Sequence, residues 1–207
     1  MLNLYEVNKQ ILKVEDGSIT AIIGSSGSGK SFFAKTISEN YNIPLIKNIF
    51  LVEKKQEYPE DILVLLKSFF KKSLLKKDNL SLEDKTILAI INSYFSDTII
   101  IDDVLSYINE SDKLKIINFL RKKRKTLIYT TSNVSELIYA DRIIIIENGE
   151  IVTEDKAENV LKDERLLKKA GLGLSFIFDL SNKLICYDLI NEVYISEKDL
   201  VRALWKK

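Results

Sequence analysis

The sequence contains no histidine, and Cys186 is its only cysteine in 207 residues. A single cysteine excludes an intrachain disulfide framework, and the scarcity of both residue types excludes zinc clusters built on histidine and cysteine. These absences favour an intracellular setting. The missing histidine also removes the commonest general base from any enzymatic mechanism.

Strong net charge and long apolar runs are lacking as well. The chain has 31 Lys and Arg against 30 Asp and Glu, a net charge of +1, so no general field attracts nucleic acid and no such partner is expected. No run approaches the roughly 18 apolar residues of a membrane span, and the N-terminal MLNLYEVNKQ lacks a basic segment followed by an apolar stretch. Any role at a membrane would therefore come through a partner.

Short apolar runs alternate with amphipathic segments, which predicts an α/β protein with a mainly parallel sheet and one sizeable core. Strands are expected at residues 19–23, 98–103, 126–131 and 141–152, the last turning at Asn148-Gly149 as hairpins do. Helices are expected at residues 31–40, at 62–77 and from Ser81 into the nineties. With two prolines and no repeat or low-complexity tract, nothing marks a flexible linker.

The stretch GSSGSGKS, residues 24–31, fits the phosphate-loop pattern G-x-x-x-x-G-K-S between a strand and a helix. Backbone N–H groups in such a loop close around phosphates, Lys30 reaches the β and γ oxygens, and the Ser31 hydroxyl ligates Mg²⁺. The alternative is a glycine-rich turn that binds nothing. The predicted nucleotide-binding residues of this segment are Gly24, Ser25, Ser26, Gly27, Ser28, Gly29, Lys30, Ser31 and Phe32.

An acidic residue at the end of a buried strand completes such a site, and TIIIDD at 98–103 provides it. Asp102 is expected to hold Mg²⁺ through water. The alternative is that two acids cap a strand end. ATP and Mg²⁺ are the expected cofactors.

The phosphate loop, the acidic strand and the stretch TLIYTTSNVSELIYADRIIIIENGEIV together resemble the ATP-binding subunit of an ABC transporter over most of the chain. In that family a glutamate after the strand aspartate polarises the attacking water, and a switch histidine follows the next strand. The resemblance places Asp103 and Ser132 at these two catalytic positions. Asp103 is one methylene shorter, and Ser132 carries no charge. Asn133 with Glu136 fits a helix capping box equally well.

The family's signature, Leu-Ser-Gly-Gly-Gln, has its counterpart in Leu80, Ser81, Leu82, Glu83 and Asp84. Both glycines, which allow close backbone approach to a γ-phosphate, are lost. Ser81 with Asp84 also satisfies a capping box, so a purely structural role is as well supported. The family's D-loop matches residues 105–109, with Asn109 at the usual aspartate.

Two further positions are left open by the resemblance. The Q-loop ligand of the metal is Glu53 or the nearby Gln56, and the adenine-stacking aromatic is Tyr5 unless Tyr5 is a core residue. Only some twenty residues separate the phosphate loop from the Q-loop, so the family's antiparallel β arm is expected to be reduced. The helical subdomain that follows is short too.

The tail LLKKAGLGLSFIFDLSNKLICYDLINEVYISEKDLVRALW resembles the C-terminal region of energy-coupling factor transporter ATPases. Its periodicity predicts two short helices, the second capped by Ser196 with Asp199. We expect an ATP-binding domain at 1–163 and a helical appendage at 164–207. The resemblance implies pairing with a second ATP-binding subunit, alike or different, and binding to a membrane coupling protein on the cytoplasmic face of an importer.

The sequence therefore predicts an ATP-binding subunit that retains the means of binding but has diminished hydrolysis, because Asp103, Ser132 and the signature are all altered. A non-hydrolysing or regulatory ATP-binding subunit is the first alternative. A small P-loop kinase is the second, and it would need a lid with phosphate-binding arginines. Arg121 and Arg124, in RKKRK, are interpreted instead as a solvated helix end, and contact with anionic lipid head groups is the alternative.

Overall fold

The computed structural model describes residues 2–47, 58–70, 80–173, 176–194 and 196–205. Glu53 and Gln56, the two residues predicted for the Q-loop, lie outside these ranges. So does the second half of the helix expected at 62–77.

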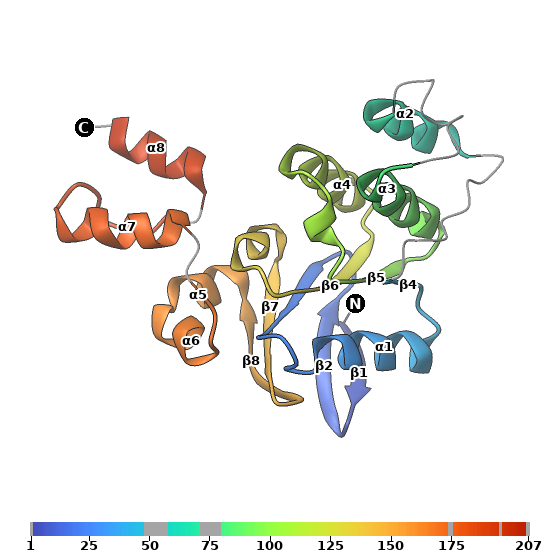
Figure 1. The fold of residues 1–207 in the computed structure, drawn as a ribbon, viewed down its shortest axis with the longest axis horizontal. Helices are drawn as coiled ribbons and strands as arrows, with labels where there is room; N and C mark the ends of the chain where they lie inside the picture. Colours follow the sequence, from blue (N-terminus) through green and yellow to red (C-terminus); the bar gives the residue numbers. More distant parts are fainter. Residues whose placement is uncertain (1, 48–57, 71–79, 174–175, 195, 206–207) are drawn as a thin grey trace.

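A six-stranded sheet forms the centre of the molecule, in the order β4-β5-β6-β3-β7-β8 (Figure 1). The strands from β4 to β7 run parallel, and β8 pairs antiparallel with β7 at the edge. The strand bounds are Ile19–Ile23 for β3, Leu45–Ile46 for β4, Thr98–Asp102 for β5, Thr126–Thr131 for β6, Arg142–Glu147 for β7 and Glu150–Lys156 for β8. The predicted strands and the hairpin turn at Asn148-Gly149 are confirmed.

Alternate residues of the central strands belong to two different cores. In β5, Ile99 and Ile101 pack on one face and Ile100 on the other; in β7, Ile143 and Ile144 divide in the same way. Continuous apolar runs are expected for parallel strands that are covered on both faces. The sheet is therefore a buried layer, and what it can present to a ligand lies at its strand ends.

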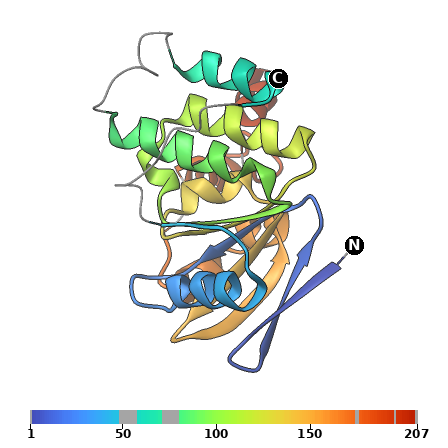
Figure 2. The ribbon, with the colours of Figure 1, turned by 90° about the vertical axis from the view of Figure 1, so that its right-hand side faces the viewer.

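Helices from different parts of the chain cover the two faces, as Figure 2 shows. One face is packed by α1 and by the N-terminal hairpin, and the other by α2, α3, α4, α5 and α6. The helix bounds are Lys30–Tyr41 for α1, Glu60–Phe69 for α2, Leu82–Asn92 for α3, Glu110–Lys122 for α4, Ala157–Lys162 for α5 and Glu164–Lys169 for α6. No helix in the described ranges is both long and apolar enough to cross a membrane.

An antiparallel hairpin of β1 (Leu2–Val7) and β2 (Gln10–Glu15) opens the chain, and the sequence patterns above did not predict it. Its turn residues Asn8 and Lys9 both have positive φ, 50° and 64°, as a tight hairpin turn requires. Between the phosphate loop and Lys47 the chain forms α1 and β4, with no antiparallel arm. The family's β arm is thus absent from residues 24–47.

Two helix predictions have different outcomes. Ser81 caps α3 through a full capping box with Asp84, as expected: the Ser81 hydroxyl accepts from the Asp84 N–H, and the Asp84 carboxylate accepts from the Ser81 N–H. The helix expected at 62–77 is shorter, because α2 ends at Phe69 and Phe70 is extended, with φ −111° and ψ 125°.

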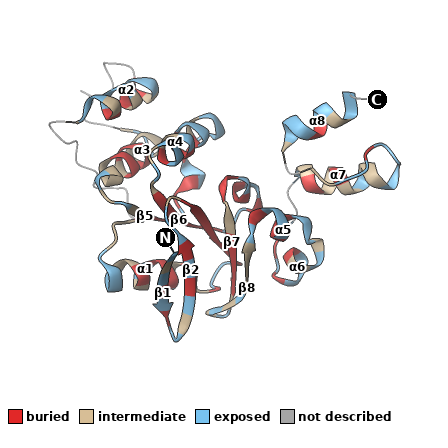
Figure 3. Ribbon diagram, turned by 180° about the vertical axis from the view of Figure 1, so that it is seen from behind, coloured by how far each residue is buried: buried red, intermediate tan, exposed pale blue. Residues whose placement is uncertain are grey.

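The C-terminal segment divides between core and appendage. Leu167 of α6 belongs to the core beneath the sheet, whereas α7 (Phe176–Cys186) and α8 (Glu197–Trp205) stand apart from it in Figure 1. Ser196 caps α8 by accepting from the Asp199 N–H, as expected. In Figure 3 α8 carries a wide exposed face, whereas most of α7 is of intermediate burial. The boundary at 163/164 stays a prediction.

Candidate functional site

The phosphate loop joins β3 to α1 at the carboxyl edge of the sheet, and it requires glycine at two points. A Cβ atom at position 24 would lie 2.3 Å from the carbonyl oxygen of Ile146 and 2.4 Å from Ser28 Oγ. Gly29, the N-cap of α1, has φ 106°. Because Gly29 has no side chain to cap the helix, the first N–H groups of α1 are available to an anion.

Lys30 lies across this loop. Its Nζ donates to the carbonyl oxygens of Gly24 and Ser25 over 2.8 and 2.9 Å, and the residue is only 7% exposed. Burial lowers the pKa of Lys30, and the nearby carboxylates of Asp103 and Asp102 oppose this effect only in part. Lys30 thus supplies a desolvated cation at the phosphate loop, where it attracts an anion more strongly than it would in water.

Asp102 ends β5 and is the most connected polar residue of the site. Its Oδ1 accepts from Ser31 Oγ over 2.9 Å and from Thr130 Oγ1 over 2.6 Å, while Oδ2 lies 2.7 Å from Lys47 Nζ. Burial raises the pKa of Asp102, but the ammonium of Lys47 and the hydrogen bonds from Thr130 and Ser31 outweigh this effect and hold the pKa below its ordinary value. Asp102 is therefore an anion beside the phosphate loop.

Lys47 was not predicted as a site residue. It directly follows β4. Because Ile46 of β4 lies opposite Ile101 of β5, the residues that come next in the two segments, Lys47 and Asp102, lie side by side. No sequence motif marks this lysine. Its proximity to Asp102 depends on the pairing register of two strands more than fifty residues apart.

Asp103 follows β5 in a left-handed conformation, with φ 57°. Aspartate tolerates this region better than most residues do. Burial raises the pKa of Asp103; Lys30 opposes the shift, and the charges of Asp102 and Glu136 add to it. Compared with Asp102, Asp103 is the carboxylate with the greater tendency to hold a proton.

A small pocket of about 260 Å³ brings the phosphate loop together with both predicted catalytic residues. It lies where the carboxyl ends of β3, β5 and β6 meet, the position at which open α/β sheets bind ligands. The residues that line it are Ser26, Gly27, Gly29, Lys30, Ser31, Phe32, Asp103 and Ser132.

Hydrogen bonds of the neighbouring residues hold the turn that carries Ser132 in place. Thr131 Oγ1 donates to Glu136 Oε2 over 2.6 Å and accepts from the Asn133 N–H over 2.9 Å. Asn133 caps the short 3-10 helix η4 (Val134–Tyr139) by accepting from the Ser135 N–H. The expected capping box of Asn133 with Glu136 is wrong in its second half, because Glu136 is buried and bonds to Thr131 and Lys113 instead.

The signature-like segment has a structural role within the chain. Besides the Ser81 capping box, Glu83 Oε1 accepts from the backbone N–H and from Nδ2 of Asn109, over 2.8 and 2.6 Å. Asn109 in turn caps α4. The segment therefore joins the starts of α3 and α4, and its residues are not among those that line the phosphate pocket.

Tyr5 is a core residue and does not line the phosphate pocket, which is a correction to its expected stacking role. It is 5% exposed in the core shared with α1, and its ring meets that of Tyr41 edge to face at 4.9 Å. Tyr41 ends α1, the opposite end from the phosphate loop. Arg121 lies in the last turn of α4 and is exposed, as expected for a solvated basic helix end; it also pairs with Asp141 over 2.7 Å and donates to the carbonyl oxygen of Tyr139.

The donor chemistry near Ser31 suits a hard divalent cation, since a hydroxyl and a carboxylate are the oxygen ligands that Mg²⁺ prefers. Ser31 Oγ and Asp102 Oδ1 are already 2.9 Å apart. The second carboxylate oxygen, however, faces the ammonium of Lys47. The residues present therefore fit Mg²⁺ on one side of Asp102 only.

Comparison with known sequences finds one matching family model and several similar proteins. A family model described as an AAA domain matches residues 13–137, more than half of the chain. An energy-coupling factor transporter ATP-binding protein EcfA1 from Mesomycoplasma hyopneumoniae is 34% identical over 128 residues, 60% of this chain. The chain matches 46% of the length of that relative. A protein of the same name from Listeria innocua is 22% identical over 209 residues, 99% of this chain and 72% of its own length.

Solved structures match in fold. The cbiO1 protein of Clostridium perfringens, part of the ABC transporter complex cbiONQ, has a TM-score of 0.56 and 16% identity, and the match covers 81% of this chain and 91% of that one. A dimeric ATP-binding cassette bound to ADP and Pi has a TM-score of 0.52 and 14% identity, covering 75% of this chain and 96% of its own. The chain belongs to the AAA-domain family, is similar in sequence to energy-coupling factor transporter ATP-binding proteins, and has the fold of an ABC-type ATP-binding cassette.

Proposed function

We propose that this chain is the ATP-binding subunit of an ABC transporter of the energy-coupling factor type, coupling ATP binding and slow hydrolysis to import through membrane partners. The observation that carries the proposal is the pocket in which Lys30 and Ser31 meet Asp103 and Ser132 beside the ion-paired Asp102. The similarity to the EcfA1 proteins supports the transporter assignment.

Binding is assigned to the phosphate loop. The N–H groups that begin α1 and the buried ammonium of Lys30 present positive charge to the phosphates, and the exposed ring of Phe32 borders the same pocket. Mg²⁺, when bound, would neutralise charge that develops on the β and γ oxygens. Ser31 and Asp102 are the residues that would hold it.

Hydrolysis is assigned to Asp103, which we propose accepts the proton of the attacking water. Its raised pKa favours proton acceptance, but its side chain is one methylene shorter than the family's glutamate, and a displacement of roughly 1 Å can reduce a rate about a hundredfold. Ser132 lines the same pocket, and we assign it to the γ-phosphate, to which it can donate only a neutral hydrogen bond. Slow turnover is the expected result.

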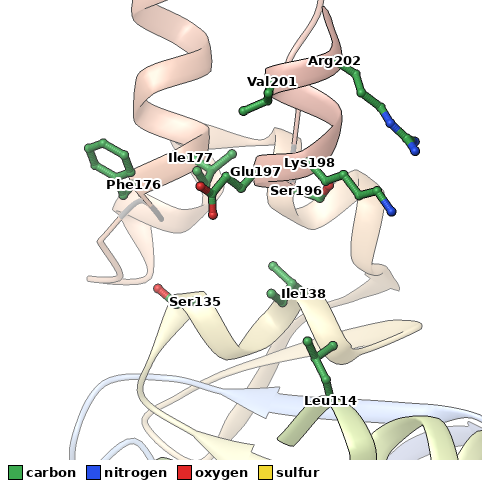
Figure 4. A pocket seen from close by; sticks show the side chains of 10 residues that line it. All are labelled: Leu114, Ser135, Ile138, Phe176, Ile177, Ser196, Glu197, Lys198, Val201 and Arg202. Carbon is green, nitrogen blue, oxygen red and sulfur yellow. The ribbon is translucent and has the colours of Figure 1, made fainter. Parts of the chain in front are cut away.

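Partner binding is assigned to the C-terminal helices. Phe176 of α7 and Trp205 of α8 are 73% and 85% exposed, and exposed large apolar side chains are a common feature of interaction surfaces. Phe176 lines a cavity of about 740 Å³, in which Ile177 and Val201 lie opposite Leu114 and Ile138 (Figure 4). We propose that this surface, α7 and α8, pairs with a second ATP-binding subunit, while a membrane coupling protein binds near α2.

A second candidate is a nucleotide-binding subunit that does not hydrolyse ATP. The observation in its favour is that the position matched to the family's switch histidine is the uncharged Ser132, so Lys30 is the only cation among the described residues that line the pocket. Such a subunit would complete or regulate an assembly through its ATP-bound state.

One experiment separates the two candidates. ATP hydrolysis by the purified chain is measured at saturating Mg²⁺, and bound nucleotide is quantified in the same sample. Turnover that is absent from Lys30→Ala supports an ATPase, and tight binding without turnover supports the non-hydrolysing subunit. Lys35→Ala, on the exposed face of α1, is the matched control and should behave as the unaltered chain. Absence of nucleotide from the unaltered chain would overturn both.

A further inference from the structure

Lys47 and Asp102 form an ion pair in which the two side chains have very different surroundings. The Lys47 side chain is 55% exposed and the Asp102 side chain 1%, yet Nζ lies 2.7 Å from Oδ2. The hydroxyls of Ser31 and Thr130 bond to the other oxygen, Oδ1. One carboxylate oxygen of Asp102 thus faces neutral donors, and the other faces a cation.

The ammonium of Lys47 lies beside the carboxylate that is expected to hold a metal ion. Asp102 is the residue that would hold a divalent ion beside Ser31, and Lys47 presents its positive charge to the same carboxylate. An ammonium group has three N–H donors, so pairing with Asp102 does not use all of the donors of Lys47. The exposed stem of Lys47 leaves it free to adjust its reach.

We propose that Lys47 is a built-in counter-cation of the nucleotide site: its ammonium supplies at Asp102 the positive charge that a divalent ion would otherwise bring, so that nucleotide binds with little dependence on metal. This inference rests on the proposed nucleotide-binding function. It concerns how the phosphates are held and leaves the hydrolytic step unchanged.

The electrostatic reason lies in the charges that face the phosphates. Asp102 is a buried anion next to the phosphate loop, and without a counter-charge it would repel a nucleotide. With Lys47 in place the pair is neutral, and Lys30 remains to attract the phosphates. Removal of Lys47 would restore the repulsion, and a divalent ion would then be needed to cancel it.

The test is the ratio of ADP dissociation constants in EDTA and in Mg²⁺, measured by calorimetry. The unaltered chain should show a ratio within about threefold of one, and Lys47→Gln a ratio of at least about tenfold, the order expected for one close charge interaction. Lys47→Arg, which keeps the charge, should retain the low ratio. Lys35→Gln, an exposed lysine of α1 outside the pocket, is the control for general charge loss and should not change the ratio.

A second readout follows the metal alone. Mn²⁺ binding to the ADP-loaded chain, measured by electron paramagnetic resonance, should be about tenfold tighter in Lys47→Gln than in the unaltered chain, because the ammonium no longer competes for Asp102. A purely structural Lys47 would lower thermal stability in Lys47→Gln without changing either the ADP ratio or Mn²⁺ affinity.

The outcomes distinguish the two proposals. A ratio above about tenfold in the unaltered chain, unchanged in Lys47→Gln, would overturn the role of Lys47 while nucleotide binding stands. No ADP binding by the unaltered chain, with or without Mg²⁺, would overturn the proposed function itself.

Discussion

Lys113 and Glu136 form a buried ion pair of 2.9 Å that joins two separate elements, α4 and η4. The side chains are 4% and 2% exposed. Glu136 also accepts from Thr131, the residue before Ser132, so the pair fixes the turn that carries one wall of the phosphate pocket. A second carboxylate, Glu110, contacts Lys113 over 3.0 Å from the surface.

Replacement of Lys113 by methionine should lower the free energy of unfolding by about 3–5 kcal/mol, because it leaves Glu136 as a buried charge without its partner. The double variant Lys113→Met with Glu136→Gln should recover at least about half of the loss, since glutamine removes the charge and still accepts from Thr131. Urea denaturation of the four chains measures the cycle. Equal losses in the single and double variants would contradict the coupling.

The Lys113–Glu136 pair should also make the stability of the protein depend on pH in the alkaline range. Burial lowers the pKa of Lys113, but hydrogen bonds to Glu136 and Glu110 outweigh it and raise the pKa above 10.5. A raised lysine pKa means that the stabilisation is complete below 10.5 and is lost as pH rises through the folded-state value. The difference in unfolding free energy between the unaltered chain and Lys113→Met should therefore stay constant from about pH 6 to 9 and narrow above about 10.5. A narrowing that begins near neutral pH would disprove this.

Gly24→Ala should disrupt the phosphate loop. The added methyl would lie 2.3 Å from the backbone oxygen of Ile146, which cannot rotate away, so we expect a loss of about 1–3 kcal/mol in stability and at least about tenfold in nucleotide affinity. Gly173→Ala is the control, because position 173 has open space around it and no positive φ. Thermal melts and nucleotide titrations check both variants, and normal affinity in Gly24→Ala would argue against the assigned loop geometry.

Asp103→Asn should separate hydrolysis from binding. Asparagine tolerates the left-handed backbone at this position and keeps the side-chain shape, so folding and ATP affinity should be nearly unchanged. Single-turnover hydrolysis should fall by about 10²–10⁴, the usual contribution of a general base. An unchanged rate would assign proton acceptance to another group.

Val201→Glu with Leu204→Glu on α8 should weaken pairing. Both side chains are partly exposed, at 43% and 38%, and a carboxylate there would be desolvated in an apolar interface. We expect the dimer dissociation constant of the ATP-loaded chain to rise by at least about tenfold in sedimentation experiments. Lys35→Glu on α1 controls for added negative charge. A concentration-independent monomer for the unaltered chain would contradict self-pairing.

The features that were predictable from the sequence depend on residues close together in the chain. GSSGSGKS predicts a loop because its glycines, lysine and serine act within one turn of backbone, and Ser81 with Asp84 predicts a cap three residues long. The isoleucine-rich strands were equally clear, because both faces of a covered parallel sheet are apolar. The meeting of Asp103 and Ser132 is different: the family resemblance implied it, and the parallel pairing of β5 with β6 brings it about.

The features that the sequence patterns missed depend on contacts between residues that are far apart in the chain. Tyr5 could have been a stacking residue or a core residue, and only the packing of the β1–β2 hairpin against α1 made it a core residue. Glu136 looked like a local cap, but its charge is matched by Lys113 on another helix.

By itself the amino-acid sequence determined the phosphate loop, the acidic strand end and the parallel α/β order, since each is encoded by local pattern. Only the tertiary structure decided which cation faces Asp102. Lys47 reaches that carboxylate because β4 pairs with β5 in one register, and a register is set by the sum of many apolar contacts across the sheet, which no short motif records.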